Sequence, residues 1–271
     1  MKRYIIRSED CRKTIKTMKN KGIKVDCVLT SPLYNTSRKV RTETEIKERK
    51  SKYKVYDDAK PLGEYVDFIV SVIQSINDIL KADGVILLNM SYASSVEIGM
   101  IGSNLIKLLN EIIERTAFDI ADIIVWKKNS ALPNNRSSNK CTRICEFVFV
   151  LCRKKEYKTY KSNKKLTKEI AEKGLRYYSN IFNFFEARNN VGKNDYNNAT
   201  YSIDMVHKLL EMYVQDNSIV YDPFAGTCTT AVACKLEGRR VACICSEIDK
   251  EQCEYWKERL LNGKFFRYAS T

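Results

Sequence analysis

Apolar and polar positions along the chain follow two periods, one typical of buried strands and one typical of helices. Short apolar runs predict strands at residues 25–30, 85–91, 119–126, 146–152, 218–222 and 239–246. Apolar residues at helical spacing predict helices over 64–81, 104–115, 203–214, from 229 onward and over 249–261. Asp83-Gly84 is expected to end the helix over 64–81. Strands that alternate with helices from end to end favour an α/β fold with a mainly parallel sheet.

Composition supports a globular protein with a polyanionic partner. Of the 271 residues, 44% are apolar and 30% are charged, and the net charge is +14. The segment 127–176 holds 15 Lys or Arg residues against four acids, so it carries a net charge of +11. A solvated charged face is the alternative interpretation. Four interleaved tyrosines favour contact with a phosphate backbone: Tyr157, Tyr160, Tyr177 and Tyr178.

Targeting and redox features narrow the protein class further. No apolar run is long enough to span a bilayer, and the start MKRYIIRSEDCRK has no signal-peptide core. We therefore expect a soluble, cytoplasmic protein without membrane contact. The chain has ten cysteines, no CxxC pair and a single histidine, His207. This pattern predicts reduced, mostly buried thiols and no metal site.

A candidate ligand loop follows the predicted strand at 218–222. Its sequence DPFAGTCTT, residues 222–230, leads into a helix whose first backbone N–H groups can hold a carboxylate or a phosphate. Gly226 allows close backbone approach, and Glu247 comes 21 residues later, where an acid receives ribose hydroxyls in nucleotide-binding α/β folds. The loop has no GKS/T sequence, so we expect an adenosine ligand that bears a carboxylate, such as S-adenosylmethionine. The alternative is a simple turn followed by a helix cap.

A second candidate site lies at the end of the first predicted strand. Ser31 and the Pro32 carbonyl could accept hydrogen bonds from an exocyclic NH2 group, while the Tyr34 ring stacks on the base. An ordinary strand-to-loop turn is the alternative, since Ser-Pro and Tyr-Asn both favour turns.

Together, DPFAGTCTT and the upstream LTSPLY resemble the amino-methyltransferases of DNA, in the permuted motif order usually called the beta group. VILLNMSYAS, ADIIVWKKNSALPNN, NATYSIDMVHKLLEMY and RRVACICSEIDKEQCEYWKERL are similar to further segments of that family, so the resemblance covers nearly the whole chain. It implies a Rossmann-like methyltransferase fold that uses S-adenosylmethionine. Three departures occur: Leu33 replaces a proline, Cys228 replaces a glycine, and residues 198–202 lack the usual proline.

The resemblance also implies roles for individual residues. The catalytic residues would be Ser31, Pro32 and Tyr34. The cofactor-binding residues would be Asp10, Thr200, Tyr201, Asp222, Phe224, Ala225, Gly226, Thr227, Thr229 and Glu247. The implied reaction is direct methyl transfer to an amino group of a flipped base. Cytosine N4 is favoured because Ser stands first in SPLY, and adenine N6 is the alternative.

Charge and motif order suggest how the chain is divided and what it binds. Residues 1–152 would form the catalytic half with a charged loop at 36–60, residues 153–195 a small target-recognition insertion, and residues 196–271 the cofactor-binding half. Double-stranded DNA is the expected partner, with these contacts: Arg38, Lys127, Lys128, Arg136, Lys140, Arg143, Lys154 and Lys155. An RNA methyltransferase and a catalytically silent nucleic-acid-binding homologue are the rival interpretations. The sequence leaves open whether a second subunit or a cognate restriction endonuclease is a further partner.

Overall fold

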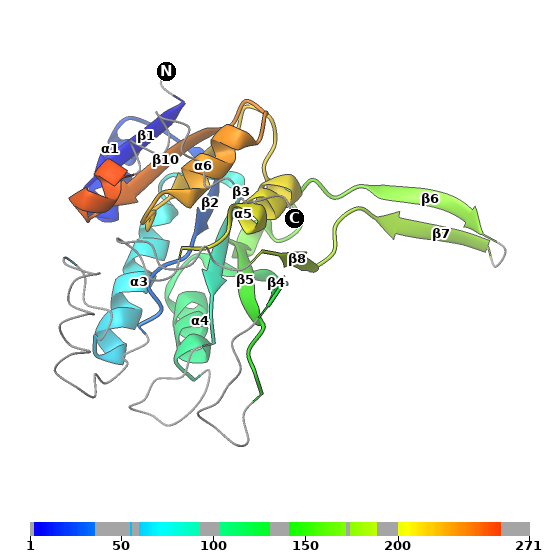
Figure 1. The fold of residues 1–271 in the computed structure, drawn as a ribbon, viewed down its shortest axis with the longest axis horizontal. Coiled ribbons are helices and arrows are strands. Elements are labelled where there is room, and N and C mark those ends of the chain that lie inside the picture. The colour runs from blue at the N-terminus through cyan, green and yellow to red at the C-terminus, as the bar shows by residue number, and fades with distance from the viewer. Residues whose placement is uncertain are drawn as a thin grey trace.

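The centre of the protein is an eight-stranded sheet (Figure 1). The computed structural model describes residues 3–35, 55, 60–92, 103–130, 141–171, 174–188 and 200–255. Across the sheet the strands are β1 (Tyr4–Ser8), β10 (Ala242–Glu247), β9 (Ile219–Asp222), β2 (Val25–Thr30), β3 (Leu80–Met90), β5 (Cys145–Arg153), β4 (Phe118–Lys128) and β8 (Phe184–Ala187). Strand β5 is antiparallel to β3 and β4, and the other neighbours are parallel. The predicted α/β fold with a mainly parallel sheet is confirmed.

Helices cover both faces of the sheet (Figure 1). One face packs against α5 (Ile203–Tyr213) and α6 (Thr229–Leu236), and the other against α1 (Cys11–Asn20), α3 (Leu62–Ile76) and α4 (Ser103–Arg115). Side chains alternate along β2 because successive strand residues point to opposite faces. Cys27 and Leu29 belong to the α5–α6 core, whereas Val28 belongs to the other. Two apolar layers therefore hold the sheet in place.

The predicted end of the helix over 64–81 is wrong. Helix α3 ends at Ile76, and Leu80 already pairs with Val25 as the first residue of β3. Arg153, at the end of β5, fixes this early turn. Its guanidinium donates to the backbone carbonyls of Asn77 (2.9 Å), Leu80 (2.7 Å) and Lys81 (2.6 Å). A tertiary contact from a residue 72 to 76 positions downstream thus overrides the local helical pattern.

Asp83-Gly84 lies inside β3 and does not end a helix. A Cβ atom on Gly84 would lie 2.8 Å from the Asp26 carbonyl oxygen and 2.7 Å from a Leu80 methyl carbon. The register between β2 and β3 also shifts between Val25 and Cys27, which brings the two backbones together here. Glycine is needed at this position because of that close approach.

Strand β1 and helix α1 lie within residues 4–20, for which the sequence pattern predicted no element. Tyr4 and Ile6 pack toward the α5–α6 core, while Ile5 packs toward the opposite one. This two-residue period is typical of a strand, although it is short and lies among charged residues. β1 pairs with β10, so Tyr4–Ser8 lies beside the last strand of the described residues.

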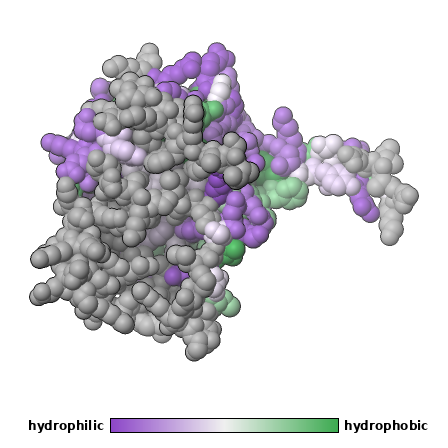
Figure 2. All heavy atoms as spheres, viewed as in Figure 1, coloured by the Kyte–Doolittle hydropathy of each residue, from purple (hydrophilic) through white to green (hydrophobic). Residues whose placement is uncertain are grey.

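A two-stranded hairpin stands clear of the sheet (Figures 1 and 2). It consists of β6 (Leu166–Ala171) and antiparallel β7 (Gly174–Ser179), and it follows the short helix η1 (Lys154–Glu156). Leu166, Leu175 and Tyr177 are 49–62% exposed on it. The hairpin lies within the predicted recognition insertion at 153–195. Arg153 and β8 of that segment instead belong to the main sheet.

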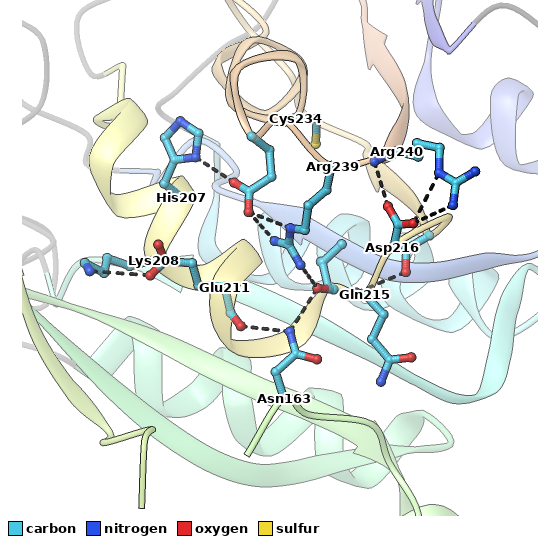
Figure 3. Close-up of polar contacts among 12 residues, drawn as sticks. Asn163, His207, Lys208, Glu211, Gln215, Asp216, Cys234, Arg239 and Arg240 are labelled. Atoms are coloured by element: carbon cyan, nitrogen blue, oxygen red, sulfur yellow. Dashed lines mark hydrogen bonds and ion pairs between the residues drawn. The ribbon is translucent and has the colours of Figure 1, made fainter. Parts of the chain in front are cut away.

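A polar cluster closes the end of α5 (Figure 3). Arg239 donates to the Val214 carbonyl and to the buried Glu237 carboxylate, which also contacts His207 Nδ1 at 2.7 Å. Asn163 Nδ2 donates to two carbonyls at this helix end, those of Glu211 (2.8 Å) and Val214 (2.9 Å). Carbonyls at a helix C-terminus lack partners within the helix, so these donors stabilise the α5–α6 layer.

Replacing Arg153 by Ala should lower the free energy of unfolding by ~3 kcal/mol, because three half-buried carbonyls lose a charged donor. Urea unfolding measures this change. Arg115→Ala is the matched control, since Arg115 makes exposed ion pairs with Asp67 and Glu111 and should matter little. Equal stability losses for the two variants would contradict the role given to Arg153.

The ten thiols are free, and eight of them are buried. Across the described ranges, no cluster of three or more His, Cys, Asp or Glu side chains is arranged as a metal site. No helix in the described part of the chain is both long and apolar enough to cross a membrane.

Candidate active site

The two candidate motifs meet at the carboxyl edge of the sheet. β2 and β9 are parallel neighbours, with Cys27 opposite Val220 and Val28 opposite Tyr221. The segment 31–35 follows β2, and the loop 223–228 follows β9. Thr30 Oγ1 donates to Asp222 Oδ1 at 2.8 Å and so joins the two strand ends directly. Residues almost 200 positions apart therefore form one site.

A hollow opens between these motifs. Its lining consists of Ser31, Thr200, Tyr201, Phe224, Ala225, Gly226, Thr227 and Thr229. All eight are candidate residues from the sequence, and the structure brings them together. Ser31 comes from the SPLY segment and the others from the two cofactor segments, so a ligand in the hollow would lie directly beside Ser31.

Asp222 supports the hollow from below. Its carboxylate is fully buried and accepts hydrogen bonds from the hydroxyls of Thr30, Tyr201 (3.0 Å) and Thr230 (2.6 Å), and from the Phe224 amide (3.1 Å). Burial raises the pKa of Asp222 to about 7, although the three hydroxyls oppose this shift. Asp222 does not line the hollow, so its role in the structure is to support the loop that does. A direct contact with a cofactor stays a prediction.

Glu247 holds the glycine loop from the end of β10. One carboxylate oxygen accepts from the Gly226 amide at 2.7 Å and the other from the Asp249 amide at 2.9 Å. Burial raises the pKa of Glu247, and the two amides oppose the shift. Each oxygen keeps a further lone pair, so the residue can also accept ribose hydroxyls.

Cys228 occupies a conformation that favours glycine. Its φ is 57° and its ψ is 41°, in the left-handed region, directly before α6. This geometry explains why the resembling family has glycine there. The side chain is fully buried in the α5–α6 core and is not among the residues that line the hollow. The bulk of the thiol at this departure from the family pattern therefore lies in the core and not in the hollow.

Tyr34 turns its hydroxyl into a polar network below the SPLY segment. The hydroxyl lies 2.9 Å from Ser31 Oγ, 2.8 Å from Asn89 Nδ2 and 3.1 Å from Glu146 Oε2. Burial raises the pKa of Tyr34 well above 10, and the negative charge of Glu146 adds to the shift. The ring is partly buried against the apolar layer formed by the sheet with α1, α3 and α4. Stacking of this ring on a base stays a prediction.

Sequence reasoning missed Asn89 and Glu146. Asn89 is 1% exposed near the end of β3, and Glu146 is 5% exposed at the start of β5. Each is a polar residue in an otherwise apolar strand, in the sequences VILLNMS and EFVFVLC. Buried polar groups need partners, so this was the signal that could have marked them.

Asn35 joins the two ends of the charged segment. Its side chain accepts from the Lys60 amide and donates to the Lys60 carbonyl, both at 2.8 Å. Apart from Val55, residues 36–59 lie outside the described residues. The start of α3 is thereby tied to the residue that follows Tyr34.

Asp10 lies at the same edge as Glu247, because Ser8 is opposite Glu247 in the β1–β10 pair. Its carboxylate caps α1 by accepting from the Arg12 amide (2.9 Å), and it also binds the Arg12 guanidinium (2.6 Å). These hydrogen bonds lower the pKa of Asp10. Arg12 lies over the Phe68 ring, which contacts Phe224 of the hollow at a centroid distance of 5.8 Å. Asp10 is thus connected to the hollow through neighbours.

The predicted DNA contacts divide into groups. Arg38, Arg136 and Lys140 lie outside the described residues. Arg143 is exposed near the site, with its guanidinium over the Tyr92 ring. Lys127 pairs with Glu186, and Lys128 pairs with the buried Glu146 at 2.6 Å. Lys154 and Lys155 follow the far end of β5, at the opposite edge of the sheet.

Among these predicted DNA contacts, the one at Lys154 agrees least with the structure. Its Nζ donates to the carbonyls of Ile113 (2.6 Å) and Thr116 (3.1 Å) and so closes the C-terminal end of α4. This placement argues against a contact between Lys154 and DNA bound beside Ser31. The density of charged residues along the sequence could not reveal this placement of Lys154, because the sequence does not show that β5 runs antiparallel to its neighbours.

Comparisons with known proteins match this arrangement. A family model described as DNA methylase matches residues 25–258. The type II methyltransferase M.HinfI of Haemophilus influenzae is 25% identical over 235 residues, which are 85% of this chain and 61% of M.HinfI. The chain therefore spans less than two thirds of the length of that relative.

Solved structures share the fold. The PvuII DNA methyltransferase, described as cytosine-N4-specific, has a TM-score of 0.68 at 16% identity, with 97% of this chain and 89% of that chain covered. The complex of M1.HpyAVI with S-adenosylmethionine has a TM-score of 0.59 at 21% identity, with 95% and 99% covered. The family match includes both motifs that form the hollow, and this chain belongs to the DNA methylases.

Proposed function

We propose that the protein transfers a methyl group from S-adenosylmethionine to an exocyclic amino group of a base in double-stranded DNA. The observation that carries the proposal is the position of Ser31, which lines the hollow together with the residues of the cofactor loop. A site for the methyl donor and a hydrogen-bond acceptor for the methyl acceptor thus share one cavity. M.HinfI, described as a type II methyltransferase, supports the assignment.

The residues around the hollow fit the cofactor. Thr229 Oγ1 is buried and has no hydrogen-bond partner among the described residues, and it lies at the N-terminus of α6. Helix N-termini favour anions, so Thr227 and Thr229 would hold the methionine carboxylate. Glu247 would accept the ribose hydroxyls. Thr200 and Tyr201, which line the same hollow, would close over the methionine portion.

When bound, S-adenosylmethionine supplies an electrophilic methyl group on its sulfonium. Ser31 Oγ and the Pro32 carbonyl would accept hydrogen bonds from the amino group, because none of the described residues donates to that carbonyl. These bonds would turn the nitrogen toward sp3 geometry and free its lone pair to form the N–C bond. The methyl carbon–sulfur bond would break, the neutral thioether would leave, and the nitrogen would lose one proton to solvent. Positioning and pocket electrostatics then supply the rate, without a covalent intermediate on any thiol.

Cytosine N4 is our proposed acceptor, with adenine N6 as the alternative. Ser stands first in SPLY, as in the cytosine-N4 members that the segment resembles, and the PvuII enzyme with the same fold is described as cytosine-N4-specific. The target base would leave the duplex, at a cost of a few kcal/mol that stacking on Tyr34 would partly offset.

Product analysis tests this proposal directly. Purified protein is incubated with labelled S-adenosylmethionine and unmethylated genomic DNA, or with structured RNA in parallel, and the nucleosides are identified by mass spectrometry. N4-methylcytosine supports the proposal, whereas N6-methyladenine keeps the reaction and corrects the base. Label in RNA alone supports an RNA methyltransferase. Cofactor binding without any methylated nucleoside supports the silent homologue.

Target recognition would come from the β6–β7 hairpin. Lys168 and Tyr177 are opposite each other on the two strands, and both are exposed, Tyr177 by 62%. The major groove of DNA admits a two-stranded ribbon, and lysines on such a ribbon contact the phosphate backbone beside the groove. We therefore propose the hairpin as the reading element within 153–195. A homodimer and a cognate restriction endonuclease stay predictions.

The double variant Lys168→Ala, Tyr177→Ala should weaken DNA binding about tenfold or more at moderate salt, because it loses one phosphate contact and one stacking ring. Binding isotherms at several salt concentrations measure this change, and cofactor affinity should stay the same. Lys19→Ala removes one lysine charge from the end of α1 and is the matched control. If the double variant loses no more DNA affinity than Lys19→Ala does, the hairpin is excluded as the element that reads the DNA.

A further inference from the structure

A buried carboxylate, Glu146, is linked to the proposed substrate contact, Ser31, through one intervening side chain, Tyr34. Glu146 is 5% exposed, and its two oxygens have different partners. Oε1 lies 2.6 Å from Lys128 Nζ. Oε2 accepts from Asn89 Nδ2 at 3.0 Å and from the Tyr34 hydroxyl at 3.1 Å. The Lys128 ammonium lies against this carboxylate and compensates its buried charge.

Counting hydrogens in this network fixes the directions of its hydrogen bonds. An ionised carboxylate only accepts, so the single hydroxyl hydrogen of Tyr34 points to Glu146. The Tyr34 oxygen then only accepts. Asn89 faces the same groups with its amide nitrogen, which only donates. The amide nitrogen has two hydrogens, and its shorter contacts are with the Tyr34 oxygen (2.8 Å) and with Glu146 (3.0 Å). The charge on Glu146 therefore orients the Tyr34 hydroxyl hydrogen.

Ser31 is the last member of the network. Its hydroxyl has the Tyr34 oxygen at 2.9 Å as acceptor, while Asn89 Nδ2 at 3.3 Å is a donor. The Ser31 hydrogen must therefore point to Tyr34, away from the hollow that Ser31 lines. A lone pair of Ser31 Oγ is left on the side of the hollow, where an amino group needs an acceptor.

We propose that Glu146 is a positioning residue that acts through Tyr34 and keeps the Ser31 hydroxyl oxygen in the accepting orientation toward the substrate amino group. The inference rests on the proposed amino methyl transfer. It also changes the role of Lys128, which serves as the counter-ion of Glu146, in place of the predicted DNA contact. Without Glu146, the Tyr34 hydrogen could turn to Ser31 and direct the Ser31 hydrogen into the hollow.

Glu146→Gln tests the proposal, because the amide keeps the shape but adds a donor beside the Tyr34 oxygen. We expect kcat to fall roughly 10- to 100-fold, with the KM for DNA and the Kd for S-adenosylmethionine unchanged. Tyr34→Phe should give a similar loss while it keeps the Lys128–Glu146 pair intact. Glu186→Gln is the matched control, since it removes an exposed carboxylate paired with the adjacent Lys127 and should leave kcat unchanged.

A double-mutant cycle separates positioning from a merely structural role. In a Ser31→Ala background, single-turnover rates should show no further loss from Glu146→Gln, because the group it orients is gone. The same fold loss in both backgrounds would overturn the proposal, and so would full activity of Tyr34→Phe. Thermal unfolding of each variant verifies that it is folded. If the wild-type protein transfers no methyl group to a base, the proposed function fails; if it does so and the cycle is additive, the inference alone fails.

Discussion

Ser31→Ala should lower the rate of methyl transfer roughly 10²- to 10³-fold and leave the affinity for S-adenosylmethionine unchanged. Ser31 is the residue of the SPLY segment that lines the hollow, and the loss of its Oγ acceptor would leave the amino lone pair delocalised into the base ring. The cofactor would keep its contacts with the loop after β9, with α6 and with Glu247. Single-turnover rates measure the transfer step, and calorimetric titration measures cofactor binding.

Ser71→Ala is the control for this experiment. Its exposed hydroxyl donates to the Phe68 carbonyl within α3, so its loss should change neither quantity. Retained turnover in Ser31→Ala, or a parallel loss of cofactor binding, would contradict the role of Ser31 as the acceptor for the amino group. Combined loss would instead indicate that the hydroxyl helps to shape the cofactor hollow.

Asp222→Asn should cost roughly 2–4 kcal/mol of stability and weaken cofactor binding strongly. The carboxylate accepts from four donors on four segments: Thr30 at the end of β2, Tyr201 before α5, Phe224 in the loop and Thr230 in α6. An amide places an NH2 group against donors and leaves buried hydroxyls unsatisfied. Urea unfolding and cofactor titration measure the two effects. Asp216→Asn is the control, because its exposed carboxylate pairs with Arg240 and should matter little.

The stability gap between wild type and Asp222→Asn should also depend on pH. Burial raises the folded-state pKa of Asp222 to about 7 from 3.8, so the folded protein holds this proton more tightly than the unfolded chain does. The contribution of the group to stability is therefore fully present at acid pH and is lost as the pH rises from about 4 to about 7. We expect a larger gap at pH 5 than at pH 8. A gap that grows with pH would show that the four donors outweigh desolvation.

Much of the fold and of the hollow could be predicted from the sequence, because the strands and the two motifs are visible as local patterns. The strand at 25–30 was predicted with its exact bounds, since an apolar run followed by SPLYN leaves little ambiguity. All eight residues of the hollow were named: Ser31 and Gly226 stand out in local motifs, whereas Thr200 and Tyr201 were implied only by the resemblance to the family. By contrast, the end of α3 depends on Arg153, which reaches it from a distant strand.

The polar network and the individual DNA contacts could not be predicted in the same way. Glu146 meets Tyr34 only because β5 enters the sheet in the antiparallel direction and starts at the edge where β2 ends. The same reversal carries Lys154 to the opposite edge, where it closes α4. Charge counts along the chain contain no information about which edge a lysine reaches.

The strand order has a consequence for synthesis on the ribosome. β1 and β2 are consecutive in the sequence, but β10 and β9 separate them in the sheet. The first strand therefore has no partner until the segment around Cys243 to Glu247 has left the exit tunnel. The Thr30–Asp222 bond spans 192 positions, so loop closure over most of the chain precedes the assembled site. A nascent chain that stops before β9 therefore lacks Asp222 and the loop that follows it, so the hollow beside Ser31 forms only after the segment through Thr229 has been synthesised.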